Sequence, residues 1–255
     1  MEGRKLAKHV GILAHSTEGA ALCFLAYCQE GGRVLGAHVY PDVTMDYIAF
    51  GHSMPAWDAG DYDSVRATLS RSVDRLARAG ADFFVCPDNT AHLALGRPGP
   101  DLALPGLHIA EVVADHAARD ARTRVGVLGT RYTMDAPLYP RALAARGLTA
   151  EVPGEADRQL INKIIFDELV DGVFTEASRQ QYVRVIEDLA ARGCDAVALV
   201  CTEIPLLVTP DVSPLPTLDS TRLLARAALA VALGDQPLPA WRGGPAGTDR
   251  PRSAG

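Results

Sequence analysis

The sequence contains no apolar run of the roughly 18 residues that a membrane-spanning helix requires. Its charged N-terminal residues are followed by an apolar stretch that is too short for the core of a signal peptide. It also lacks an excess of positive charge, because 25 lysines and arginines stand against 31 acidic residues, a formal net charge of −6. We therefore expect neither a membrane nor a nucleic-acid partner.

Cysteine and histidine are present without the spacing that a metal or disulfide framework needs. The cysteine count is odd and no pair has zinc-ribbon or CxxC spacing. The seven histidines include no HxxxH pair, so we expect no structural or catalytic metal. Unpaired cysteines fit a reducing, cytoplasmic setting. The five are Cys23, Cys28, Cys86, Cys194 and Cys201.

Strand-like and helix-like segments alternate along the 255 residues, which predicts α/β architecture with mainly parallel sheets. Each half opens with an apolar strand and a turn, and each reaches a further apolar strand that ends in a polar loop. We predict two similar lobes related by a pseudo-two-fold axis, with a ligand cleft beyond the carboxyl ends of the strands. The predicted bounds are 1–112 completed by 216–236, then 113–215, with a disordered Gly/Pro-rich tail at 237–255.

Local signals place several elements of the first lobe. Residues 9–13 and 36–40 are predicted strands, and residues 20–30 a helix that Gly31 and Gly32 end. A second helix is predicted to start at a cap on Asp63 or Ser64.

Two segments carry most of the functional signal. Residues 85–92 (VCPDNTAH) and 200–205 (VCTEIP) each follow an apolar strand and open into a Thr-containing turn before a helix. Together they resemble the catalytic segments of the cofactor-independent aspartate/glutamate racemase superfamily, where a Cys-Asn-Thr and a Cys-Thr-Glu loop face each other across one substrate. Further similar stretches are 124–130, 161–169, 193–197 and 218–221, and the resemblance runs from Val10 to about Val231.

The resemblance implies two-lobed α/β subunits, often homodimers, that act on a small-molecule carboxylate or amino acid without pyridoxal phosphate or any other cofactor. The superfamily contains amino-acid racemases, hydantoin racemases, maleate isomerases and arylmalonate decarboxylases. It therefore fixes the fold and the site more closely than the reaction.

Inverting a carbon next to a carboxylate without a cofactor requires one acid/base group on each face of that carbon. The two loops offer Asp88 and Cys201 as the catalytic pair. Amide and hydroxyl groups around them would disperse the developing enediolate charge. Lys163 joins the predicted substrate-binding residues because it resembles a carboxylate-binding position of the family. The full predicted set is Ser16, His52, Asn89, Thr90, Thr130, Thr133, Lys163, Thr202 and Glu203.

Two departures from the family pattern affect the chemistry. Asp88 stands where the first catalytic thiol belongs, and Cys86, two residues earlier, is expected to be a buried strand residue. We expect desolvation and a nearby Cys201 thiolate to raise the pKa of Asp88. Aspartate racemases resembling this chain also place an arginine after the second strand, whereas residues 51–58 contain none.

The leading hypothesis is therefore an amino-acid racemase or epimerase of the aspartate/glutamate type that transfers a proton between Asp88 and Cys201. One alternative keeps the cleft but changes the reaction, to an isomerase, a decarboxylase or a specialised biosynthetic epimerase on a non-aspartate substrate. The other is a non-catalytic member that binds a small carboxylate.

Overall fold

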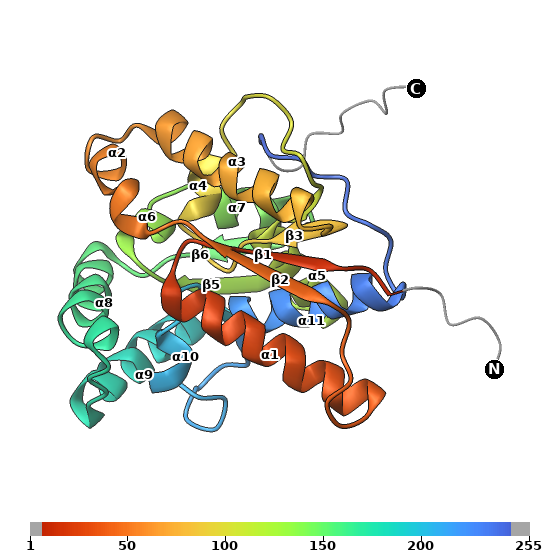
Figure 1. The fold of residues 1–255 in the computed structure, drawn as a ribbon. Coiled ribbons are helices and arrows are strands. Elements are labelled where there is room, and N and C mark those ends of the chain that lie inside the picture. Colours follow the sequence, from red (N-terminus) through yellow and green to blue (C-terminus); the bar gives the residue numbers. More distant parts are fainter. Residues whose placement is uncertain (1–6, 246–255) are drawn as a thin grey trace.

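The computed structural model describes residues 7–245 and contains two lobes, each built on a four-stranded parallel sheet (Figure 1). The strand orders are β2-β1-β3-β4 and β6-β5-β7-β8, so the second sheet repeats the topology of the first. The predicted two-lobed α/β fold is confirmed. The strands are β1 (Val10–Ala14), β2 (Val43–Tyr47), β3 (Phe83–Val85), β4 (Gly106–Leu107), β5 (Arg124–Leu128), β6 (Thr149–Glu151), β7 (Ala196–Leu199) and β8 (Thr217–Asp219).

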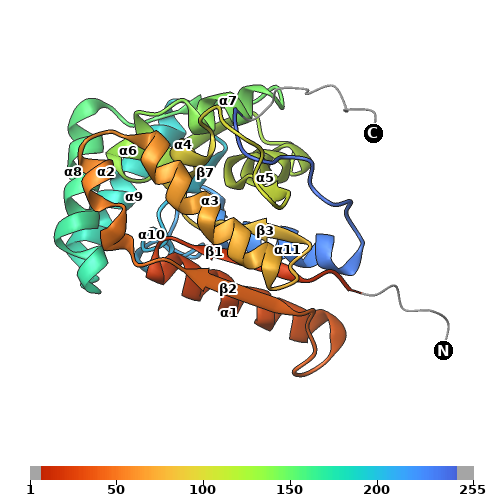
Figure 2. The same cartoon turned by 45° about the horizontal axis from the view of Figure 1, so that its top comes forward.

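Helices cover both faces of each sheet. Four of them pack in a row, α1 against α11, α11 against α5 and α5 against α7, and share one apolar core with residues of both sheets (Figures 1 and 2). This shared core holds the lobes together, because burying apolar area is the main force favouring the folded state. The helices are α1 (Thr17–Leu35), α2 (Met54–Asp58), α3 (Tyr62–Arg78), α4 (Ala91–Leu95), α5 (Ile109–Arg119), α6 (Arg131–Met134), α7 (Leu138–Ala144), α8 (Glu155–Asp167), α9 (Glu176–Ala191), α10 (Ile204–Leu207) and α11 (Ser220–Leu233), with 3-10 turns at Phe50–His52 and Leu169–Asp171.

Separate apolar clusters cover the outer faces of the two sheets. In the first lobe α3 packs there, and in the second lobe α8 and α9 pack there (Figure 2). Within the described residues, no helix has both the length and the apolar character needed to cross a membrane.

Three predicted boundaries in the first lobe are wrong. Helix α1 continues through Gly31 to Leu35, and the Tyr40 side chain packs closely against Gly31. A Cβ at Gly31 would lie 2.6 Å from the Tyr40 Cβ. Residues 36–40 are consequently a loop, and the second strand is β2. Asp61, rather than Asp63 or Ser64, caps α3 by accepting the Ser64 N–H.

The chain passes back from the second lobe to the first at a later residue than predicted. Strand β8 pairs in parallel with β7, so residues 217–219 extend the second sheet rather than complete the first lobe. Helix α11 then packs against α1 of the first lobe. The crossing therefore occurs at the start of α11, a point that becomes important at the site.

Residues 237–245 are ordered, which corrects the prediction of a disordered tail over that part. The Trp241 ring stacks on His92, with centroids 5.7 Å apart, and also contacts Phe84 and His108. Its carbonyl accepts the Gly106 N–H at 2.8 Å. These contacts explain why a Gly/Pro-rich segment has a defined conformation. Residues 246–255 lie outside the described residues.

We predict that Trp241→Ala lowers the free energy of unfolding by about 2–4 kcal/mol, because it removes a large aromatic contact surface against the first lobe. Chemical denaturation would measure the change. Leu238→Ala is the control, since Leu238 is 45% exposed and should change stability by less than about 0.5 kcal/mol. Equal stability of both variants would show that the segment is not anchored as described.

Candidate active site

A cleft of about 290 Å³ lies at the carboxyl ends of the strands and is lined by both lobes. It receives residues that follow β1 and β3 in the first lobe, and β5 and β7 in the second. Parallel strands deliver these four loops to one edge of their sheets. The predicted residues that line it are Ser16, Asp88, Asn89, Thr90, Thr130, Cys201, Thr202 and Glu203.

The three other predicted binding residues lie outside this lining. His52 is exposed in the 3-10 turn after β2. Thr133 is buried, and its hydroxyl lies 3.4 Å from that of Thr130. Lys163 is on α8 with its side chain 73% exposed, and it forms an ion pair with Asp167 one turn away. The structure thus brings the two predicted catalytic loops together, and none of the described residues that line the cleft is a lysine.

Asp88 is held by a histidine that was not among the predicted site residues. His15, at the end of β1, is buried, and its Nδ1 lies 2.6 Å from Asp88 Oδ2. The Trp57 indole N–H donates to His15 Nε2 at 3.2 Å. An indole can only donate, so Nε2 accepts and the ring proton is on Nδ1, where it is donated to the carboxylate. Trp57 therefore fixes the tautomer that serves Asp88.

The pKa of Asp88 lies below its ordinary value, which corrects the expectation of a raised pKa. Burial acts to raise it, but the electrostatic interaction and the hydrogen bond with the His15 ring act in the opposite direction. The Ala91 N–H adds a further hydrogen bond to Asp88 Oδ1, at 3.1 Å. These interactions offset burial, so Asp88 is a carboxylate at neutral pH and can accept a proton.

Cys201 is in the opposite protonation state. Burial, the charge of Glu203 and the hydrogen bond to Glu203 raise the pKa of the Cys201 thiol well above its ordinary value. Its S–H donates to Glu203 Oε2 at 2.9 Å. The charge of Asp88 raises this pKa further, which shows that the two groups lie close enough to interact. The cleft therefore contains one ready base and one ready acid.

A buried hydrogen-bond chain connects the two catalytic loops. Asn89 Nδ2 donates to Ser220 Oγ at 3.1 Å, and Ser220 Oγ donates to the Leu199 carbonyl at 3.1 Å. The Tyr139 hydroxyl donates to the other end of the Asn89 amide, at 2.5 Å. Leu199 ends the strand that leads to Cys201. Asn89 thus holds the Asp88 loop at a fixed position relative to the Cys201 loop.

His92 holds the backbone of the Asp88 loop. It is buried, which lowers its pKa to about 4 and keeps it neutral. Its Nδ1–H donates to the Asp88 carbonyl at 2.9 Å, and its Nε2 accepts the Ile109 N–H at 3.3 Å. Cys86 is buried in the apolar cluster under α3, as expected for a strand residue, and does not line the cleft.

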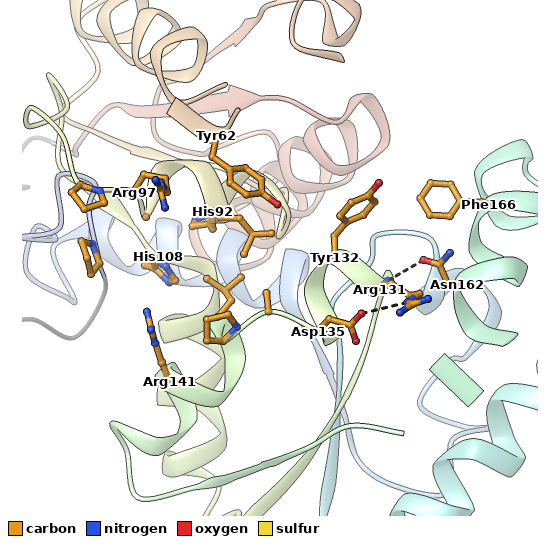
Figure 3. A pocket seen from close by; sticks show the side chains of 17 residues that line it. Tyr62, His92, Arg97, His108, Arg131, Tyr132, Asp135, Arg141, Asn162 and Phe166 are labelled. Carbon is orange, nitrogen blue, oxygen red and sulfur yellow. Dashed lines mark hydrogen bonds and ion pairs between the residues drawn. The ribbon is translucent and has the colours of Figure 1, made fainter. Parts of the chain in front are cut away.

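A second, larger cavity of about 850 Å³ adjoins the cleft (Figure 3). It is lined by α4 of the first lobe and by α6, α7 and α8 of the second, and Phe166 lines both cavities. Arg131 points toward Asp135 and forms an ion pair with it, so part of its positive charge is neutralised. Neither Asp88 nor Cys201 lines this cavity. The predicted catalytic pair therefore lines the smaller space and not the larger one.

Several lining residues were missed from the sequence. His15 stood in the turn after β1, where a polar side chain directly after an apolar strand could have indicated a role. Trp57 reaches it from 42 residues away in the sequence. Pro87 and Val200 lie within the two motif segments but were not selected as site residues. The remaining lining residues were also not selected: Thr17, Glu18, Tyr47, Phe50, Ile165, Phe166 and Val170.

Comparison with known proteins is consistent with this geometry. Residues 25–228 match the family described as Asp/Glu/Hydantoin racemase. The chain therefore belongs to this family and is an isomerase of the racemase type. The broad specificity amino-acid racemase RacX of Bacillus subtilis (strain 168) is 24% identical over 181 residues, 69% of this chain and 76% of the relative.

Two solved structures share the whole architecture. One is a candidate Asp/Glu racemase from Yersinia pestis, which is 31% identical, has a TM-score of 0.80, and covers 89% of this chain and 99% of its own. The other is PH1733, an aspartate racemase homologue from Pyrococcus horikoshii OT3, with 25% identity, a TM-score of 0.77, and coverage of 88% and 99%. The likeness extends over both lobes that form the cleft.

We predict that His15→Ala moves the acid limb of the pH–rate profile to higher pH. Without His15, burial of Asp88 is less opposed, so the pKa of the carboxyl rises and the base becomes protonated at a higher pH. kcat/KM at neutral pH should fall by about 100-fold, the size of a weakened general base. Trp57→Phe keeps the aromatic ring but loses the donor, and should move the limb less in the same direction. An unmoved limb in a folded His15→Ala protein would contradict the role of His15.

We predict that Glu203→Gln lowers the pKa of Cys201, because it removes a neighbouring negative charge that stabilises the thiol. The midpoint of the pH dependence of iodoacetamide alkylation at Cys201 should fall by about one unit or more. Mass spectrometry would identify the labelled residue, with Cys201→Ala as the blank. A midpoint at or above that of the wild type would show that Glu203 does not hold the thiol protonated.

Proposed function

We propose that this racemase-family enzyme is a cofactor-independent amino-acid racemase or epimerase in which Asp88 and Cys201 are the two acid/base groups. One observation carries the proposal: a carboxylate held ionised and a thiol held protonated line the same cleft from opposite lobes. A two-base inversion needs this pair of protonation states at the start of a turnover.

The proposed reaction has two proton transfers. Asp88 takes the hydrogen on the α-carbon as a proton, and the bonding electrons move into the substrate carboxylate to form an enediolate. The Cys201 S–H then protonates the opposite face of the carbon, leaving a thiolate beside Glu203. The enzyme returns to its starting state when Asp88 loses its proton and Cys201 regains one from solvent. Charge, atoms and electrons balance without a cofactor.

The hydroxyl groups of the cleft support the negative intermediate. Thr90, Thr130 and Thr202 line the same space as Asp88 and Cys201. Hydroxyl donors that face the developing charge stabilise it most in a site that excludes water. The hydrogen-bond chain through Asn89 keeps the Asp88 loop and the Cys201 loop at a fixed distance during the proton transfers. A homodimer and a cytoplasmic location stay predictions from the sequence.

The same geometry supports a second candidate, a one-way isomerase or decarboxylase. The unequal resting states of Asp88 and Cys201 favour it, because such reactions need proton delivery from one face only. Exchange of the α-hydrogen distinguishes a racemase from a decarboxylase. A racemase removes the α-hydrogen of an amino acid, whereas a decarboxylase leaves it in place.

We predict that the wild-type enzyme in D2O forms product enantiomer that carries deuterium at the α-carbon. Cys201→Ala should lower racemisation by about 1,000-fold, because the second face has no acid. It should still exchange the α-hydrogen of one enantiomer, the one that presents this hydrogen to Asp88. NMR of both enantiomers of each amino acid measures exchange, and chiral chromatography measures inversion.

Asp88→Asn should abolish that single-enantiomer exchange at neutral pH, because the remaining thiol is protonated. Cys28→Ala is the matched cysteine control, since Cys28 is half-buried on α1 and does not line the cleft. Racemisation at the wild-type rate by Cys201→Ala would reject the two-base assignment. An absence of α-hydrogen exchange by the wild-type enzyme with every amino acid tested would reject the racemase proposal.

A further inference from the structure

The charge of the catalytic cleft is unusual for a site that would bind an acidic amino acid. Its lining contains three carboxylates, on Glu18, Asp88 and Glu203, and no lysine or arginine among the described residues. His15 is the one imidazole of that lining, and its acceptor nitrogen is occupied by Trp57. The catalytic pair defines the site, and this charge distribution restricts what the site can hold.

Lys163 and Arg131 do not line the cleft, and each is paired with a carboxylate outside it. Lys163 is exposed and paired with Asp167. Arg131 lies in the neighbouring cavity and forms an ion pair with Asp135 (Figure 3). It forms a second ion pair with Glu155. A side-chain carboxylate of aspartate or glutamate would therefore meet no guanidinium or ammonium group among the described residues that line the cleft. Leaving water for a site of like charge is strongly unfavourable.

Glu18 is the acid of this lining that catalysis leaves unused. It lies in the first turn of α1, is exposed, and has no hydrogen-bond or ion-pair partner among residues 7–245. Asp88 is engaged by His15, and Glu203 by Cys201. The Glu18 carboxyl group is therefore available to a ligand at the cleft.

The walls next to Glu18 suit a long aliphatic side chain. Tyr47 and Phe50 line the cleft from the first lobe, and Phe166 and Val170 line it from the second. All four are partly exposed, at 39–47%, so their apolar surface is available for contact. The Tyr47 hydroxyl lies 3.0 Å from the Thr17 hydroxyl, which places this ring beside the first turn of α1. A methylene chain can pack on these walls, and a terminal cation gains from nearby aromatic faces.

We propose that the substrate is an amino acid with a long cationic side chain, of the lysine or ornithine type, and that Glu18 binds its terminal cation. This inference rests on the proposed function for the placement of the α-carbon between Asp88 and Cys201. The cleft volume of about 290 Å³ suits a single amino acid, since sites for drug-sized ligands span roughly 300–1,000 Å³.

The test compares L-lysine with L-norleucine, which has the same chain without the ammonium group, and with L-glutamate. The wild-type enzyme should bind lysine at least about tenfold more tightly than glutamate, by calorimetry, because three carboxylates line the cleft. In Glu18→Gln, the ratio of lysine to norleucine in Kd and in kcat/KM should narrow by about three- to fivefold, the effect of one exposed ion pair. Glu18→Lys should move the lysine-to-glutamate ratio toward glutamate by about tenfold or more.

Glu187→Gln is the matched control, because it removes one acid from the exposed face of α9, outside the cleft. It should leave the lysine-to-norleucine ratio unchanged. Raising the ionic strength should narrow the wild-type ratio, since Glu18 is exposed to solvent.

The two levels of inference fail in different ways. Tighter binding or faster racemisation of glutamate than of lysine, or a lysine preference that Glu18→Gln leaves intact, would overturn the assignment of substrate and Glu18 while the racemase proposal stands. Tight lysine binding that depends on Glu18, with no α-hydrogen exchange for any amino acid, would overturn the racemase proposal and support the charge assignment.

Discussion

The chemistry of the cleft depends on the hydrogen bond between His15 and Asp88. A carboxyl group in a buried site tends to be protonated, because the charged form loses its hydration. Here the His15 Nδ1–H lies 2.6 Å from the carboxylate, and Trp57 keeps the proton on that nitrogen by donating to the other. The net result is a pKa for Asp88 below its ordinary value. Asp88 is intrinsically a weak base, but it is ionised and ready to accept a proton. A carboxylate can therefore occupy the position that the first catalytic thiol holds in the family pattern, although its protonation state at rest differs from that of a thiol.

The second lobe is tuned in the opposite direction by a carboxylate. Glu203 accepts the Cys201 S–H and raises the pKa of the thiol, so each proposed catalytic group has its own partner that sets its protonation. These partners work only if the two loops keep their relative position. The chain from Asn89 through Ser220 to Leu199 supplies that constraint, and it uses the residue at which the polypeptide passes from β8 into α11. The late return of the chain between lobes is therefore part of the site as well as part of the fold.

Much of this arrangement could be predicted from the sequence, for physical reasons that also explain the failures. Alternating apolar strands and amphipathic helices encode the two lobes, and Asp88 and Cys201 follow strands whose ends must meet at one edge. The raised pKa predicted for Asp88 was wrong because the prediction considered burial and a Cys201 thiolate but not His15, whose approach depends on the pairing of β1 with β3. Lys163 was selected by resemblance, but its helical neighbour Asp167 holds it at the surface. Trp241 anchors a segment whose composition favours disorder, because one large aromatic contact outweighs a weak local preference.

The unequal resting states of Asp88 and Cys201 have a thermodynamic consequence for the proposed racemisation. Two enantiomers have equal free energies, so kcat/KM must be the same in both directions whatever the protonation states of the free enzyme. The difference between the protonation states of Asp88 and Cys201 can therefore change the individual values of kcat and KM in the two directions. It can also change the rate at which the free enzyme returns to its starting state. After one inversion Asp88 carries the proton and Cys201 is a thiolate beside Glu203, which is the less stable arrangement. This form relaxes by exchange with solvent rather than waiting for the opposite enantiomer. A substrate with a second stereocentre removes the equality of free energies, and the same asymmetry then suits an epimerase that works mainly in one direction.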